Sequence, residues 1–212
     1  MFHIRYNELE SPWKTVFDLA WRSFSEGNLP IGAVIVDDSG RVLSTGRNHY
    51  ITSKYFPNCK VDHAETGCIQ QLDIVKYPDL GSYTLYTSME PCPMCIGTII
   101  MSNLKRVKVA AHDPWAGAAD ICLRNTYAAK KSVVVEFAGD FLANIQIALQ
   151  GCVELRNSGA NGEVYKSFME MYPLGVSAAY KLFSEKLLEK FDDTQAEQAF
   201  DCAAELIENL FD

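Results

Sequence analysis

The sequence predicts an α/β sandwich, in which helices cover both faces of one sheet. Short apolar segments rich in β-branched residues alternate along the chain with longer segments whose apolar residues recur at helical spacing. Residues 37–40, Asp-Asp-Ser-Gly, separate two such short segments and are typical of a β-hairpin turn. A stretch of 20 residues separates two later segments, 106–111 and 132–137, and a connection of that length joins parallel strands more readily than a hairpin does.

Five segments are expected to form the strands of this sheet, because each is short, apolar and bounded by turn-forming residues. They are residues 31–36, 42–46, 83–87, 106–111 and 132–137.

The first helix is predicted for residues 11–26. Ser11 is a suitable N-cap, and Pro12 suits the first helical position. The apolar residues that follow recur at helical spacing. Further helices are expected at residues 63–75, 93–103, 118–127, 141–155, 164–172, 176–191 and 194–211.

The polar, glycine-rich segment 158–162 is the best candidate for a boundary within the chain. We therefore predict one domain at residues 1–159 and a helical extension at 160–212 that packs on it. The extension contains 4 Lys and 11 Asp or Glu, a net charge of −7, out of a total of −8. The remainder of the chain is nearly neutral, and its densest basic stretch, 105–108, is interpreted as the start of a strand.

The composition is that of an ordinary globular protein, with 48% hydrophobic and 22% charged residues among 212. No run of apolar residues approaches the 18 or so that a membrane span requires, and the first residues are too polar for a signal peptide. We therefore expect no membrane association and a cytoplasmic location. In a reducing compartment the seven cysteines are expected to act as metal ligands and buried thiols rather than as disulfides.

Two short motifs carry residues suited to metal chemistry: His63-Ala64-Glu65, and Cys92 and Cys95 in a Pro-Cys-Pro-Met-Cys segment. A Cys-x-x-Cys pair at a helix start places two thiolates on one side of the first turn, where the helix dipole favours negative charge. A histidine from a neighbouring helix start completes a three-ligand zinc site, and the fourth position remains for water. Glu65 then lies close to the metal and can transfer protons.

The combination of His-x-Glu with Pro-Cys-x-x-Cys is typical of zinc enzymes that deaminate nucleobases. A closed structural zinc site would need a fourth protein ligand, for which Cys59, Cys68 or His112 are the candidates. A thioredoxin-like redox motif is a further alternative, but it would leave the His-Ala-Glu segment without a role.

Residues from about 13 to 119 resemble the cytidine-deaminase-like superfamily, closest in motif to the tRNA adenosine deaminases and guanine deaminases. The segments that carry the resemblance are 29–36, 46–48, 63–65, 85–95, 105–107 and 113–117. The resemblance implies a five-stranded mixed sheet between helices, with one zinc per chain at two helix starts. It also implies a homodimer.

The same resemblance implies which residues meet the substrate. Asn48 would donate or accept a hydrogen bond, the backbone at Ala64 would touch the base, and residues 31–33 (Ile31, Gly32 and Ala33) would line the pocket. Asp113 and Trp115 are further candidates: Asp113 either orients the polar edge of a purine or caps the turn before Pro114, and Trp115 stacks on a base or packs as an ordinary aromatic residue.

The chain departs from the family pattern at Asp62, at 66–68 (Thr-Gly-Cys), in the loop 50–60 and beyond residue 159. Substrate choice is set in such regions, so the resemblance leaves the substrate open. We expect a hydrolytic deaminase of a free base or nucleoside, with purines such as guanine or adenine favoured. A small substrate is expected rather than a nucleic acid, because phosphate binding depends mainly on Lys and Arg and the sequence contains no run rich in them. The alternatives are a tRNA-specific adenosine deaminase and a non-catalytic zinc-binding interaction subunit.

Overall fold

A computed structural model describes residues 4–211. It contains a five-stranded mixed sheet in the order β2-β1-β3-β4-β5. Strand β1 pairs antiparallel with both β2 and β3, whereas β3, β4 and β5 run parallel to one another. The strands are Gly32–Val36 (β1), Val42–Arg47 (β2), Thr84–Met89 (β3), Arg106–Ala111 (β4) and Val134–Phe137 (β5).

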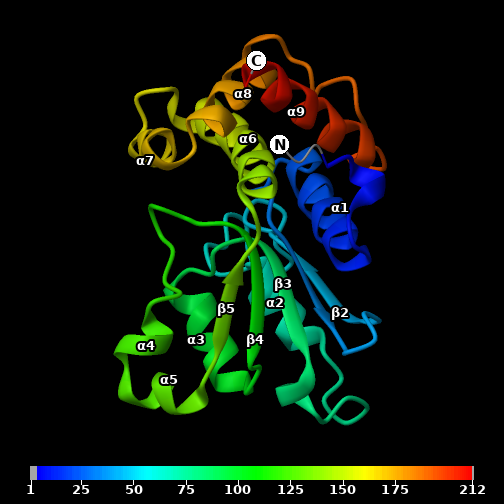
Figure 1. Cartoon of the computed structure of the whole chain (residues 1–212), viewed down its shortest axis with the longest axis vertical. Helices are drawn as coiled ribbons and strands as arrows, with labels where there is room; N and C mark the ends of the chain where they lie inside the picture. Colours follow the sequence, from blue (N-terminus) through cyan, green and yellow to red (C-terminus); the bar gives the residue numbers. More distant parts are fainter. Residues whose placement is uncertain (1–3, 212) are drawn as a thin grey trace.

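Helices cover both faces of the sheet, as predicted, because alternate side chains of a strand point to opposite faces. In β1, Val34 packs in one core with helix α1 (Ser11–Ser25) and helix α6 (Asp140–Ser158). Ile35 packs in a second core with helix α2 (Ala64–Gln71) and helix α3 (Pro93–Ser102). The architecture is therefore a three-layer α/β/α sandwich (Figure 1).

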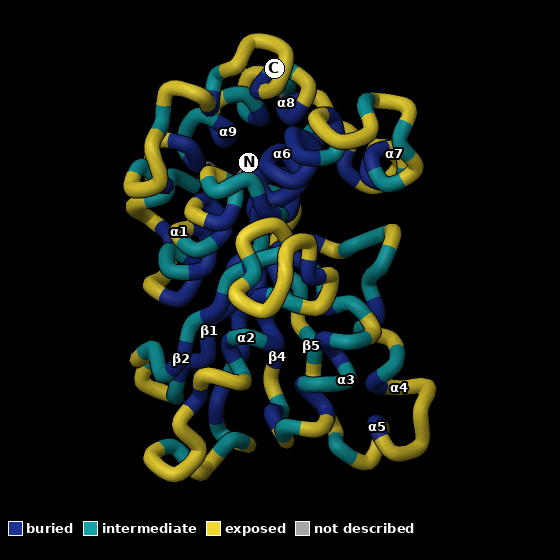
Figure 2. The backbone as a smooth tube through the Cα atoms, turned by 180° about the vertical axis from the view of Figure 1, so that it is seen from behind, coloured by how far each residue is buried: buried dark blue, intermediate teal, exposed yellow. Residues whose placement is uncertain are grey.

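The helices after α6 gather at one end of the molecule, with α9 beside α1 and α7 on the other side of α6 (Figure 1). They are α7 (Glu163–Met171), α8 (Pro173–Ser184) and α9 (Ala196–Phe211). Helix α6 is mostly buried between them and the sheet (Figure 2). Phe200 of α9 is 2% exposed, and its ring meets that of Phe17 of α1 at 5.0 Å between centroids. The C-terminal helices thus share a core with α1, and the division of the chain at residue 159 stays a prediction.

Several element boundaries differ from the sequence-based expectation for local reasons. The helix expected at 118–127 is two short ones, α4 (Ile121–Arg124) and α5 (Thr126–Lys131), because the Asn125 side chain caps the backbone N–H groups of Tyr127 and Ala128 and so starts a new helix. Helix α2 ends at Gln71, four residues earlier than expected. The helix expected at 176–191 starts at Pro173 and ends at Ser184.

The part of the chain that the structure describes contains no helix both long and apolar enough to cross a membrane.

Candidate active site

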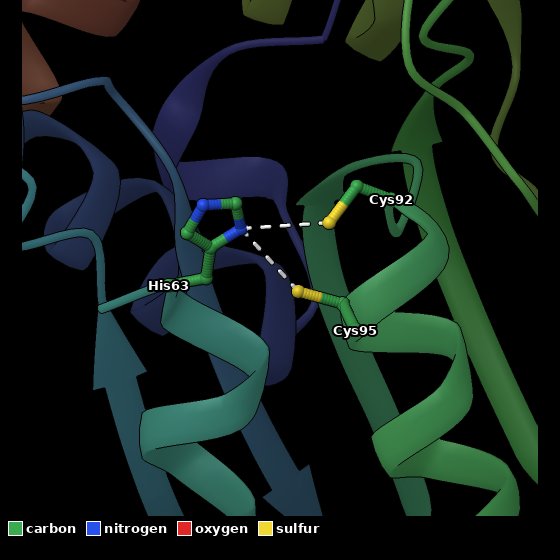
Figure 3. A group of neighbouring side chains, drawn as sticks. All are labelled: His63, Cys92 and Cys95. Carbon is green, nitrogen blue, oxygen red and sulfur yellow. Dashed lines mark hydrogen bonds between the residues drawn. The ribbon is translucent and has the colours of Figure 1, made fainter. Parts of the chain in front are cut away.

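The starts of α2 and α3 lie side by side next to the sheet (Figure 3). His63 is the N-cap of α2, and Cys92 is the N-cap of α3, with Pro93 at the first helical position. The first backbone N–H groups of each helix lack partners within that helix, so both helix starts favour anionic groups. Two separate segments thereby deliver metal-ligating side chains to one electropositive point.

A close backbone contact holds α2 in place. Gly46 of β2 lies so near to α2 that a Cβ atom there would stand 2.1 Å from the Ala64 carbonyl oxygen and 2.5 Å from the Cys68 nitrogen. Glycine is therefore required at residue 46 for the helix that carries His63 and Glu65 to lie this close to the sheet.

His63, Cys92 and Cys95 form a metal-ligating group in which all ligand atoms lie within 4.8 Å of one another. The Nδ1 atom of His63 is 3.6 Å from the Cys92 sulfur and 3.4 Å from the Cys95 sulfur. A tetrahedral zinc with ordinary bond lengths separates its nitrogen and sulfur ligands by about 3.6 Å. The donor set and its spacing therefore fit a zinc ion.

The three residues suggested above as a fourth protein ligand, Cys59, Cys68 and His112, do not join this group among the described residues. Cys59 and Cys68 are buried elsewhere. His112 instead hydrogen-bonds the Glu90 carboxylate at 3.1 Å. The arrangement has the ligand count of a catalytic rather than a structural zinc site.

The thiolate is the form of cysteine that ligates zinc, and without the metal the two ligand thiols differ. The hydrogen bond with Cys92, together with burial, raises the pKa of Cys95. A hydrogen bond from the Cys95 thiol, together with the nearby His63, lowers the pKa of Cys92 to about 4 despite partial burial. Outside the group, burial raises the pKa of Cys68 to about 12 and that of Cys152 to about 12, so both stay neutral thiols.

Glu65 follows His63 by two residues, in the first turn of α2, and is 3% exposed. Its Oε2 atom is 3.4 Å from the Cys95 sulfur, and its Oε1 atom accepts a hydrogen bond of 3.3 Å from the Thr87 hydroxyl. Burial raises the pKa of this carboxyl. Glu65 is therefore held by β3 with a carboxyl oxygen directed at the metal-ligating group.

A cavity of about 240 Å³ opens at this group. Its wall combines two of the metal-ligating residues, His63 and Cys92, and Glu65 with residues from the loop before β1, the end of β3, the loop after β4, and helices α6 and α7. The lining residues are Leu29, Ile31, His63, Glu65, Met89, Glu90, Cys92, Asp113, Trp115, Ala116, Gln150, Glu154, Val164 and Phe168.

Three of the predicted substrate contacts, Ile31, Asp113 and Trp115, line this cavity. Asp113 Oδ1 accepts hydrogen bonds from the backbone N–H groups of Trp115 and Ala116, both at 3.0 Å, and so shapes the loop on which Trp115 stands. Trp115 is 55% exposed at the rim. Their contact with substrate stays a prediction.

The other predicted contacts are not among the residues that line the cavity. Gly32 lies against the backbone of α1, where a Cβ atom would meet the Val16 carbonyl oxygen at 2.2 Å. Ala33 and Ala64 are buried in the core between the sheet and α2. Substrate contact at these three residues stays a prediction.

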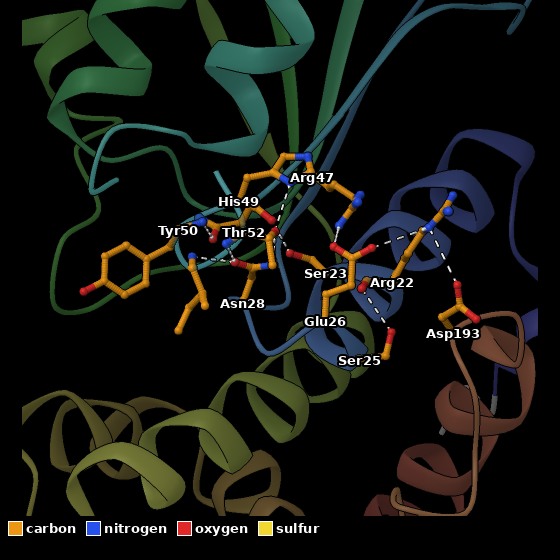
Figure 4. A network of polar contacts seen from close by, with 12 residues as sticks. Arg22, Ser23, Ser25, Glu26, Asn28, Arg47, His49, Tyr50, Thr52 and Asp193 are labelled. Atoms are coloured by element: carbon orange, nitrogen blue, oxygen red, sulfur yellow. Dashed lines mark hydrogen bonds and ion pairs between the residues drawn. The ribbon is translucent and has the colours of Figure 1, made fainter. Parts of the chain in front are cut away.

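Asn48 is fully buried at the end of β2. Its Oδ1 atom accepts a hydrogen bond of 3.0 Å from the Tyr50 backbone, whereas its Nδ2 atom finds no acceptor among residues 4–211. The adjoining loop is fixed to the end of α1, because Asn28 Oδ1 accepts hydrogen bonds from the backbone N–H groups of Ile51 and Thr52 at 2.6 and 3.1 Å (Figure 4). The structure therefore holds a buried N–H donor without a partner.

Sequence reasoning missed the cavity residues of α6 and α7, which are Gln150, Glu154, Val164 and Phe168. No local pattern marks them, because they follow the motifs by more than 50 residues. It also missed Glu90, whose carboxylate accepts hydrogen bonds from the backbone of Asp113 at 3.2 Å and of Ala119 at 3.1 Å. Its place directly before the Pro-Cys motif was the one available signal.

The family described as the cytidine and deoxycytidylate deaminase zinc-binding region matches residues 7–111. A tRNA-specific adenosine deaminase from Rickettsia bellii is 35% identical over 104 residues, which cover 48% of this chain and 69% of that protein. The chain belongs to the cytidine and deoxycytidylate deaminase family. The three residues of its metal-ligating group lie within the matched zinc-binding region.

Other similar proteins are named as deaminases of free bases. A guanine deaminase from Bacillus subtilis is 41% identical over 95 residues, covering 42% of this chain and 55% of that protein. A cytosine deaminase from Candida albicans is 28% identical over 112 residues, covering 53% and 72%. The structure of guanine deaminase from Nitrosomonas europaea superposes with a TM-score of 0.51 at 21% identity, covering 67% and 84%, which shows a shared fold.

Proposed function

We propose that this deaminase-family chain is a zinc-dependent hydrolytic deaminase of a free purine base or nucleoside. The observation that carries the proposal is the position of Glu65, a buried carboxyl beside the three-ligand group and on the wall of a small cavity. A structural zinc site has no use for such a carboxyl, whereas hydrolysis needs a group that moves protons.

The reaction consumes water, forms a carbon–oxygen bond at the ring carbon that bears the amine, and releases ammonia. Zinc held by His63, Cys92 and Cys95 would supply a Lewis acid that makes water nucleophilic at neutral pH. Glu65 takes a proton from the attacking water and passes protons to a ring nitrogen and to the leaving amine. Asn48 does not line the cavity, and its Nδ2 atom has no acceptor among residues 4–211; in this proposal a ring substituent of a substrate that reaches it accepts that hydrogen bond.

The cavity supports a small substrate. At about 240 Å³ it lies below the roughly 300–1,000 Å³ of pockets that hold larger ligands. Among the residues that the structure describes, its lining contains Glu65, Glu90, Asp113 and Glu154 but no Lys or Arg. A phosphate would meet like charge there, whereas an uncharged amino-heterocycle would meet hydrogen-bond acceptors.

A tRNA-specific adenosine deaminase is the second candidate. The similarity to the Rickettsia bellii enzyme favours it. So does a second cavity, of about 440 Å³, because Arg47, His49 and Lys54 are among its lining residues and Asp62, next to the ligand His63, also lines it. Basic groups near the site could meet a nucleic-acid backbone, although Arg47 already pairs with Glu26.

The test is ammonia release by zinc-loaded protein from guanine, adenine, cytosine, their nucleosides and a tRNA anticodon stem-loop. Glu65→Ala should abolish release while zinc content and thermal unfolding stay unchanged, and Glu185→Ala, an exposed site, should behave as wild type. Retained activity in Glu65→Ala would overturn the mechanism. Turnover of the stem-loop alone would favour the second candidate, and silence on every compound would favour an interaction subunit.

The cytoplasmic location remains a prediction, and so does the homodimer that the family resemblance implies. Analytical ultracentrifugation of the purified chain tests whether it forms a homodimer.

A further inference from the structure

Two polar residues of α6 stand on the cavity wall without a role in the proposed chemistry. Gln150 is 4% exposed, and its Nε2 atom donates a hydrogen bond of 2.9 Å to Glu154 Oε1. Its Oε1 atom is buried and meets no donor among residues 4–211. Because a carboxylate only accepts hydrogen bonds, Glu154 fixes the amide with its NH₂ group toward itself and its carbonyl oxygen away.

This pair lies on the α6 side of the cavity, whereas Glu65 and the zinc ligands come from α2 and α3. Helix α7 closes the wall beside it with two apolar residues, Val164 and the 1% exposed Phe168. A substrate whose amine faces Glu65 therefore presents another part of its ring to Gln150 and Glu154.

A buried acceptor without a donor favours ligands that carry an N–H group. An unpaired acceptor costs free energy, and a hydrogen bond from the ligand removes that cost. Within residues 4–211, the lining of the cavity has no Lys or Arg whose charged N–H groups would compete for these acceptors. The chemistry that matches an amide oxygen next to a carboxylate is thus a ring N–H.

We propose that Gln150 and Glu154 form a subsite that binds a ring N–H of the substrate. A free base carries this N–H, whereas in a nucleoside the sugar takes the place of its hydrogen. The inference rests on the proposed function and narrows its substrate class to free bases. A ribose at that nitrogen removes the donor and adds volume to a cavity of about 240 Å³.

The experiment compares each free base with its N-methylated analogue: guanine with 9-methylguanine, adenine with 9-methyladenine, and cytosine with 1-methylcytosine. Binding is measured calorimetrically on the zinc-loaded Glu65→Gln protein, and kcat/KM is measured on the protein with Glu65 intact. We expect the accepted base to lose about 10- to 100-fold on methylation. In Gln150→Leu the base and its analogue should differ by less than about 3-fold.

Glu154→Gln keeps an acceptor but removes the charge, so it should reduce discrimination less than Gln150→Leu does. It also serves as the second variant should Gln150→Leu fail to fold. Glu170→Gln is the matched control, because Glu170 is an exposed residue of α7 outside the cavity lining and should discriminate as wild type does.

Discrimination that persists unchanged in folded Gln150→Leu would overturn the subsite, as would equal binding of base and nucleoside or no binding of any free base at millimolar concentration. Selective binding without turnover of any compound would support the subsite and contradict the proposed function instead, so the two failures are distinguishable.

Discussion

Replacing Gly46 with alanine tests whether the close approach of α2 to the sheet positions the site. The added methyl carbon would lie 2.1 Å from the Ala64 carbonyl oxygen, and ordinary contact begins near 3.4 Å, so α2 or β2 must move by about 1.3 Å. The two nearest of the three clashing atoms, this oxygen and the Cys68 nitrogen, belong to the backbone and cannot rotate away, and the third is the Cβ atom of Cys68 at 2.9 Å.

Overpacking of this kind costs about 1–3 kcal/mol. For a chain of this size 1 kcal/mol lowers the melting temperature by roughly 2–4 °C, so we expect a decrease of roughly 2–12 °C. A displacement of about 1 Å at reacting groups can reduce turnover about 100-fold, and α2 carries both His63 and Glu65. Differential scanning calorimetry, zinc analysis and ammonia release measure the three consequences.

Gly97→Ala is the matched control. Gly97 lies inside α3, two residues after Cys95, and a Cβ atom there has nothing within 4 Å. Alanine is the better helix former by roughly 0.5–1 kcal/mol, so this variant should be as stable as wild type or more so, with normal zinc content. If Gly46→Ala has the same melting temperature as Gly97→Ala and releases ammonia at the wild-type rate, the contact does not position α2 and the reasoning fails.

Three further perturbations test other parts of the structure. Removing the metal with a chelator should lower the melting temperature and make Cys92, whose pKa is lowered to about 4, reactive toward iodoacetamide, while Cys68 and Cys152, whose pKa values burial raises to about 12, stay unmodified. Mass spectrometry of the alkylated peptides measures this, and equal labelling of Cys92 before and after chelation would contradict it. Phe200→Ala should lower the free energy of unfolding by about 3–5 kcal/mol, because Phe200 packs on α1, and urea should still unfold the chain in a single transition. A separate transition at low urea would show instead that the C-terminal helices fold independently. Burial, with Asp113 nearby, raises the pKa of Glu154, so ionisation of this carboxyl opposes folding. Glu154→Gln should therefore have a higher melting temperature than wild type at pH 7–8, and the difference should vanish as the pH falls below the ordinary Glu pKa of about 4.3. A difference in melting temperature that does not depend on pH would refute this cause.

The metal centre was predictable from sequence because each half of it is local. The spacing of Cys92 and Cys95 places both sulfurs on the first turn of one helix, and Glu65 follows His63 by two residues at the start of another. Zinc accepts few donor types in few geometries, so these short motifs determine the ligands. The order of strands and helices predicted the sandwich for a similar reason, since hydrophobic periodicity reports which side of each element is buried.

The tertiary structure alone decided which distant residues complete the cavity. Gln150 and Phe168 reach it only because α6 packs on the sheet and α7 packs on α6. Nothing in the spacing of those residues marks them, because an amphipathic helix shows that a face is buried but not what it is buried against. The sequence by itself thus determined the chemistry at the metal, and long-range packing determined the shape and polarity of the pocket that presents a substrate to it.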